Sequence, residues 1–147
     1  MAGGRPSRAA AKRPKQPDWD HLAAAALTAR RAAYAPYSRF KVGAALVTED
    51  GAVVPGCNVE NASFGLCICA ERNVITTAVA LGQTRFSAMA IATGASPPAP
   101  PCGMCLQFMA EFCLDLELLL VNDQGERRTT RLSKLIQQPF RWKGIQP

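Results

Sequence analysis

Hydrophobic and polar positions near the start of the chain follow a helical pattern. Residues 18–35 are dominated by Ala, Leu and Arg, and Asp18 or Asp20 can accept hydrogen bonds from the free amides of a first helical turn. The segment 34–38, with the sequence YAPYS, contains a proline that a helix interior does not tolerate. We therefore expect a helix over 18–35 that ends in this segment.

The next two segments carry the β-branched and small apolar residues that strands favour. They cover 40–48 and 52–59, and the tripeptide EDG separates them. Asp-Gly between two such runs is a common hairpin turn, because glycine adopts the positive φ that tight turns need. The pattern predicts two antiparallel strands joined at 49–51.

Farther along, helical and strand-like segments alternate. The spacing of apolar residues predicts helices over 70–81, 103–113 and 132–138, and strands over 86–93 and 116–122. Strands that alternate with helices of this length are typical of helices packed on both faces of a mixed sheet. We expect an α/β fold, a three-layer α/β/α sandwich around a mixed sheet of about five strands.

The composition is that of a soluble globular protein. Hydrophobic residues make up 48% of the 147 positions and charged residues 19%, and no apolar run approaches the ~20 residues that span a membrane. The start of the chain lacks the apolar stretch of a secretory signal, so we expect the six cysteines to be reduced thiols. The expectation is a cytoplasmic protein with no membrane partner.

Five of the positive charges lie in the first 17 residues. The segment 1–17 contains five Lys or Arg residues, no acidic residue, and several Pro and Gly residues. Removing these five charges from the net charge of +6 leaves +1, which argues against a nucleic-acid partner for the rest of the chain. We expect 1–17 to be a disordered basic tail, either solubilising or weakly polyanion-binding, and 18–147 to be a single catalytic domain.

Three cysteines have the spacing and local context of metal ligands. Cys69 precedes the helix expected over 70–81, while Cys102 and Cys105 open the helix expected over 103–113. Side chains at i and i+3 of a first helical turn face the same way, and a helix N-terminus lowers the pKa of a thiol. Three thiolate ligands leave the fourth tetrahedral position of zinc open, as catalytic zinc sites require.

Glu71 lies two residues after Cys69, close enough to exchange protons with a water at such a site. A glutamate in a first helical turn also has a simpler explanation, which is that it complements the helix dipole. The lone histidine, His21, is far in sequence from both motifs, and we expect it at the surface. Glu71 is therefore the candidate proton shuttle, and no histidine is assigned to the metal.

Four motifs together resemble the small homotetrameric cytidine deaminases, a zinc-dependent family. They are FKVGAAL at 40–46, CNVENASF at 57–64, CAER at 69–72 and PCGMC at 101–105. The similarity extends from about residue 21 to residue 140. It implies one Zn²⁺ per subunit, a free nucleoside as substrate, and active sites at the interfaces of a homotetramer.

The resemblance also assigns roles to residues outside the metal motifs. It implies that Asn58 and Glu60 hold the ribose hydroxyls, that Phe40 lies against the pyrimidine, and that Ala70 contacts the substrate. Phe140 would reach the pocket of a neighbouring subunit, although the preceding IQQP at 136–139 departs from the usual Leu-Pro of the family.

Charge at the zinc is a further point that the resemblance addresses. Arg72 would donate hydrogen bonds to the cysteine sulfurs and offset their negative charge. Many members carry a second arginine after the last cysteine, where this chain has Leu106. Cys57, Cys67 and Cys113 match no ligand position, and we expect them to be buried small hydrophobes.

The implied reaction is the hydrolytic deamination of cytidine and 2′-deoxycytidine in pyrimidine salvage. Three alternatives remain open at this point. The chain could act on another small molecule, as a blasticidin S deaminase with its own PCGMC motif does, or on RNA or DNA. It could also be a structural zinc module, with Cys67 as the only nearby fourth ligand.

Overall fold

The computed structural model describes residues 16–142, so most of the basic segment 1–17 lies outside the described part of the chain. Five strands form one sheet in the order β2-β1-β3-β4-β5. Their bounds are Gly43–Thr48 for β1, Val53–Cys57 for β2, Phe86–Thr93 for β3, Glu117–Asn122 for β4 and Arg127–Arg131 for β5. Strand β1 pairs antiparallel with β2 and β3, β3 pairs parallel with β4, and β4 pairs antiparallel with β5. The mixed sheet is therefore as predicted.

The β1–β2 hairpin has the turn that its sequence predicts. Gly51 has φ of +88°, a conformation in which a side chain is strained. The Asp50 carboxylate accepts hydrogen bonds from the Thr48 hydroxyl and, at 3.2 Å, from the Ala52 amide. These bonds, the first above all, lower the pKa of Asp50.

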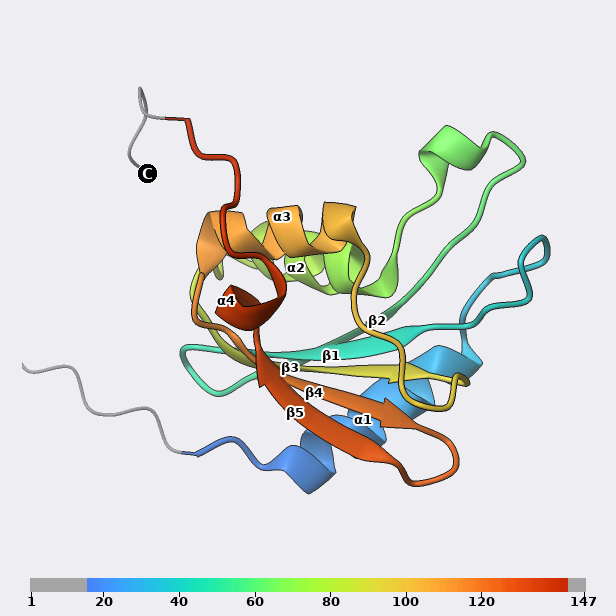
Figure 1. Cartoon of the computed structure of the whole chain (residues 1–147), viewed down its shortest axis with the longest axis horizontal. Coiled ribbons are helices and arrows are strands. Elements are labelled where there is room, and N and C mark those ends of the chain that lie inside the picture. The colour runs from blue at the N-terminus through green and yellow to red at the C-terminus, as the bar shows by residue number, and fades with distance from the viewer. Residues whose placement is uncertain (1–15, 143–147) are drawn as a thin grey trace, which may run out of the picture.

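Helix α1, Trp19–Arg31, covers one face of the sheet (Figure 1). Asp18 caps it by accepting a 3.0 Å hydrogen bond from the His21 amide. Alanines of the helix pack on alanines of the strands, so the two backbones lie close together. A Cβ added to Gly43 would lie 2.1 Å from the Ala26 carbonyl oxygen, which explains why β1 begins with glycine.

The first helix ends four residues before the predicted position. The backbone of Tyr34 does not continue the helix but pairs with the segment after β2, donating to Asn58 O at 3.1 Å and accepting from Glu60 N at 2.8 Å. The prediction of helix up to residue 35 is thus wrong, because these bonds replace the last helical turn. They also bring the segment 34–40 beside Asn58 and Glu60.

The other face of the sheet carries three helices, which are shown above the sheet in Figure 1. They are α2 at Ala70–Ala80, α3 at Gly103–Phe112 and the short α4 at Leu132–Leu135. Leu46, Ile91 and Leu120 of the sheet pack against Val74 and Met109 of the helices in a buried core. With α1 on the opposite face, the expected three-layer α/β/α sandwich is confirmed.

Strand β5 was not among the segments that the sequence predicts. Its sequence RRTTR has no apolar alternation, because it is an edge strand of largely exposed residues. Gly125, with φ of +87°, makes the turn that joins it to β4. The predicted helix over 132–138 is also shorter, since Ile136 is already extended. No helix within residues 16–142 is long and apolar enough to cross a membrane.

Candidate zinc and catalytic site

Two helix N-termini bring the three predicted ligands together. Cys69 is the N-cap residue of α2 and Cys102 that of α3, and neither helix has a side-chain cap of its own. Cys105 lies one turn into α3 and is buried. The three Sγ atoms lie within 4.8 Å of one another, and Cys102 Sγ lies 3.5 Å from Cys105 Sγ.

This geometry suits a zinc ion. Zn–S bonds of ~2.3 Å in a tetrahedron place ligand sulfurs about 3.8 Å apart, close to the separations in the structure. Within residues 16–142, these cysteines are the one cluster of three or more possible Cys, His, Asp or Glu ligands. Three sulfurs leave one coordination position for water.

Neither His21 nor Cys67 joins this group. His21 is exposed on α1, as predicted, on the other face of the sheet. The Cys67 sulfur instead accepts from the Asn61 amide at 3.3 Å and donates to the Asn61 carbonyl at 3.7 Å. A four-cysteine structural site therefore has no support in the geometry. Cys57, Cys67 and Cys113 are free and only partly buried, so the expectation that they are buried is wrong.

The thiols influence one another strongly in the metal-free protein. A hydrogen bond from Cys105 lowers the pKa of Cys69 to about 5, and Arg72 adds to this effect. The same hydrogen bond and burial raise the pKa of Cys105, which retains the proton. Because zinc binds thiolates, its binding would release the protons that remain.

Arg72 lies beside the Cys69 sulfur, where its positive charge can offset the negative charge of the thiolates. One of its terminal nitrogens, Nη2, donates to Cys67 O at 3.0 Å and contacts Cys69 Sγ at 3.7 Å. Its Nε is buried and has no hydrogen-bond partner among residues 16–142. Leu106 follows Cys105 and, as a leucine, supplies no second positive charge. Its side chain is partly buried and packs against the core.

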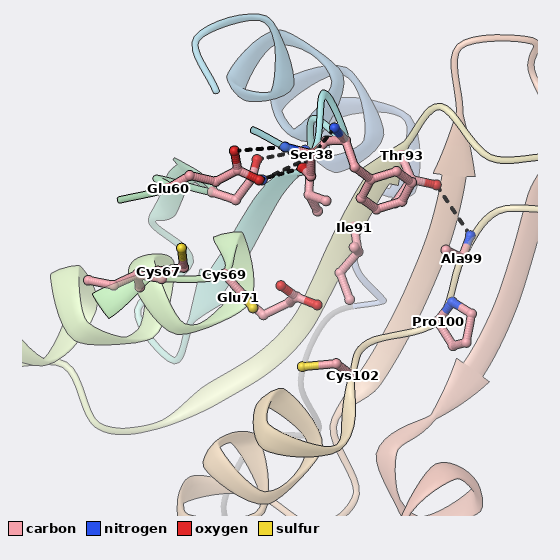
Figure 2. Close-up of a pocket in the computed structure, with 14 residues that line it drawn as sticks. Ser38, Glu60, Cys67, Cys69, Glu71, Ile91, Thr93, Ala99, Pro100 and Cys102 are labelled. Carbon is pink, nitrogen blue, oxygen red and sulfur yellow. Dashed lines mark hydrogen bonds between the residues drawn. The ribbon is translucent and has the colours of Figure 1, made fainter. Parts of the chain in front are cut away.

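The Glu71 side chain is only 5% exposed and points into a cavity beside Cys69 and Cys102 (Figure 2). Burial raises the pKa of Glu71, and the nearby Cys69 thiolate adds to the increase. A carboxylate with a raised pKa holds a proton more readily near neutral pH, as a general base and acid must. The location of Glu71 is therefore compatible with proton transfer.

The cavity beside these groups has a volume of about 320 Å³, in the range of small-molecule sites. Phe40, Val42 and Ile91 give it apolar walls, while Asn58 and Glu60 line it with polar groups. The structure thus places the sequence-predicted Phe40, Asn58 and Glu60 in one cavity with Cys69, Cys102 and Glu71.

Two other predicted substrate contacts lie outside the cavity of this chain. Ala70 is fully buried at the start of α2 and does not line the cavity. The Phe140 side chain is 70% exposed, and its backbone is fixed by Gln107, which accepts from Phe140 N at 2.8 Å and donates to Phe140 O at 2.9 Å. The structure does not test either role, and both stay predictions.

Sequence reasoning did not identify Ser38 and Thr93, which also line the cavity. The buried Thr93 hydroxyl accepts a 3.2 Å hydrogen bond from the Ala99 amide and so holds the proline-rich loop that leads to Cys102. The sequence feature that could have identified Thr93 is its position at the end of a buried strand. Ser38 has no comparable signal, because its partner Glu60 is distant in sequence.

Comparisons with known proteins agree with this site. The family model described as the cytidine and deoxycytidylate deaminase zinc-binding region matches residues 17–117. Cytidine deaminase of Halalkalibacterium halodurans is 46% identical over 116 residues, which are 78% of this chain and 88% of that protein.

Solved structures give the same result. A cytidine deaminase from Burkholderia pseudomallei has a TM-score of 0.81 and 50% identity, covering 83% of this chain and 98% of that one. A cytidine deaminase from Mycobacterium tuberculosis has a TM-score of 0.75 and 39% identity, covering 86% of this chain and 100% of that one. The chain belongs to the zinc-binding cytidine and deoxycytidylate deaminase family.

Proposed function

We propose that this protein hydrolyses cytidine to uridine and ammonia, and 2′-deoxycytidine to deoxyuridine, in pyrimidine salvage. The observation that carries the proposal is the juxtaposition of three cysteine sulfurs with the buried Glu71 in one small cavity. A purely structural zinc site would need neither the cavity nor the buried acid.

Zinc held by these sulfurs would act as a Lewis acid that makes water a nucleophile at neutral pH. Glu71 accepts the proton that the attacking water gives up and donates a proton to N3 of the pyrimidine. The water oxygen adds to C4 as a hydroxyl, and the N3–C4 double bond becomes a single bond. The Glu71 carboxylate then takes the second proton from this 4-hydroxyl and passes it to the 4-amino group, so that the C4–N bond breaks, ammonia leaves and the C4 carbonyl of uridine forms. One water is consumed for each ammonia released, following the general scheme of zinc-dependent deaminases.

The negative charge of the site is offset by the protein. Three thiolates and one Zn²⁺ carry a formal net charge of minus one, which weakens the ion as a Lewis acid. Arg72 contacts the Cys69 sulfur at 3.7 Å, and the N-termini of α2 and α3 add partial positive charge. Arg72 and the two helix N-termini therefore offset the charge without a second arginine, since its usual position holds Leu106 in this chain.

On the substrate side, Asn58 and Glu60 bind the ribose and Phe40 packs on the base, with Ala70 adding a contact. Asn58 and Glu60 lie in the same cavity as Glu71, which supports this assignment. A nucleoside offers these two residues ribose hydroxyls that free cytosine lacks, so free cytosine should be the poorer substrate. The polar and apolar sides of the cavity thus select a nucleoside.

We also propose a homotetramer in which Phe140 completes a neighbouring active site. Large apolar side chains at the surface support association, namely Phe64 and Leu66 just before Cys67 in the sequence and Phe140 and Trp142 at the end of the described chain. Sedimentation should give four times the 15.7 kDa chain mass. A cytoplasmic location fits the six free thiols.

The experiment that tests the function measures ammonia and product from cytidine, 2′-deoxycytidine, cytosine, blasticidin S and a single-stranded oligonucleotide. We expect turnover of the two nucleosides only. Release of ammonia from blasticidin S or from the oligonucleotide in preference to cytidine would refute the proposed substrate class.

A further inference from the structure

The turn between α1 and β1 is held by two side chains from the segment after β2. The Asn58 amide accepts from Val42 N at 2.8 Å and donates to Phe40 O at 2.9 Å. The Glu60 carboxylate accepts from the backbone amides of Tyr37 at 2.9 Å and Ser38 at 3.2 Å. Both proposed ribose-binding residues therefore already have a partner in this turn.

The two oxygens of Glu60 have different partners. Oε2 accepts both backbone amides, whereas Oε1 accepts the hydroxyl of Ser38 and no other donor within residues 16–142 (Figure 2). Ser38 Oγ itself accepts from Phe40 N at 3.0 Å, which directs the single hydroxyl proton toward Glu60. The Ser38 hydroxyl is thus the contact that fixes Oε1.

The turn that carries Ser38 has an unfavourable backbone conformation. Arg39 has φ of +58°, in the left-handed region that residues with a Cβ rarely adopt. Such conformations persist where surrounding contacts enforce them, and they concentrate at functional sites. Here the enforced turn places Ser38 and Phe40 together in the cavity with Glu60.

We propose that Ser38 is a positioning residue that orients the Glu60 carboxylate for the ribose of the substrate. The inference rests on the proposed function, because it assumes a nucleoside in the cavity. A carboxylate has about four acceptor sites, so Glu60 retains capacity for a ribose hydroxyl beside its three donors. The bond from Ser38 also lowers the pKa of Glu60, which keeps it ionised and able only to accept.

This role affects binding rather than the chemical step. In a Ser38→Ala protein Phe40 N loses its bond to Ser38 Oγ and Oε1 of Glu60 loses its fixed direction. The turn is still held by the two backbone amides on Oε2 and by the two hydrogen bonds of Asn58. We expect KM for cytidine to rise about tenfold, the effect of one charge-assisted hydrogen bond, with kcat within about twofold. Ser38→Thr retains the hydroxyl at an exposed position and should restore KM.

A matched control removes a serine hydroxyl that donates to a different carboxylate. Ser133, on α4, donates to Asp115 Oδ1 at 3.4 Å and does not line the cavity. Ser133→Ala should therefore leave KM and kcat unchanged. Should Ser38→Ala melt below the assay temperature, Ser38→Cys keeps a side chain of similar shape with a weak donor, and its KM replaces that of the alanine variant.

The decisive measurement is a double-mutant cycle with Glu60→Ala. Because Ser38 acts through Glu60, Ser38→Ala should change KM by less than about twofold in the Glu60→Ala background. An unchanged KM in the single variant, an equal loss in both backgrounds, or a loss in kcat alone would overturn the inference. A wild-type protein that releases no ammonia from cytidine would instead refute the proposed function, and the inference with it.

Discussion

Replacing Glu71 by glutamine tests the proton shuttle most directly. The substitution keeps the shape of a side chain that is 5% exposed beside two of the cysteines, but the amide cannot transfer protons. We expect the Glu71→Gln protein to fold, to retain zinc and to lose turnover.

The size of the loss depends on whether another group could replace Glu71. The other titratable residues that line the cavity are Glu60, Cys67 and the proposed ligands Cys69 and Cys102. Glu60 is a poor substitute, because the Ser38 hydrogen bond lowers its pKa. General acid–base catalysis contributes typically 10²–10⁴-fold, and one carboxyl here serves several proton transfers, so kcat should fall by about 10⁴-fold.

The same variant should be more stable than the wild type when zinc is removed. Burial raises the pKa of Glu71, so its ionised form destabilises the folded state. The cost is absent below the unfolded pKa of about 4.3 and grows as the pH rises toward the higher folded pKa. The metal-free variant should therefore have the higher Tm at pH 7 and an equal Tm at pH 4.

Ammonia release, zinc content and melting curves check these expectations together. Glu111→Gln is the matched control, since Glu111 is exposed on α3 and its replacement should leave kcat unchanged. A fully metallated Glu71→Gln protein with kcat within tenfold of wild type would remove Glu71 from the mechanism. A Tm difference that is the same at both pH values would show that burial of the charge is not its origin.

Four other substitutions test the site and the fold. Cys105→Ala should lose zinc, and a full zinc content by elemental analysis would mean that the ligands are wrongly chosen. Glu60→Ala should reduce kcat/KM for cytidine far more than for cytosine, and equal losses would make Glu60 structural. Arg39→Gly should raise the free energy of unfolding by about 1 kcal/mol in a urea titration, because glycine adopts a positive φ freely. An unchanged free energy of unfolding would show that the positive φ of Arg39 is not strained. Gly43→Ala should lower it by about 3 kcal/mol, because the new Cβ would meet the Ala26 carbonyl oxygen, and a stable variant would show that α1 can move away.

Much of the fold could be predicted because local signals agreed with the final packing. The Asp18 cap, the Asp-Gly turn and the apolar strand over 86–93 each have a cause within a few residues. Strand β5 lacked such a cause, since its exposed RRTTR sequence has no apolar alternation. Helix α1 ends before Tyr34, because the backbone of Tyr34 forms hydrogen bonds with Asn58 and Glu60, which are distant in sequence.

In the candidate site, too, the features with local causes could be predicted and those that depend on distant contacts could not. The metal ligands could be predicted because two cysteines share one helical turn and a third precedes another helix. The resemblance supplied Asn58 and Glu60 as ribose ligands, but their hydrogen bonds to the turn 37–42 depend on how distant segments pack. The contribution of Ser38 required the structure, because only the folded chain brings its hydroxyl to Glu60.

The location of the three cysteines on two helices has a consequence for the opening motions of the protein. An ion held by Cys69, Cys102 and Cys105 would join the first turns of α2 and α3 into one cooperative unit. Amide hydrogens in those two turns should then exchange together, slowly with zinc and faster after chelation. The amides of α1, on the opposite face of the sheet, should keep their exchange rates.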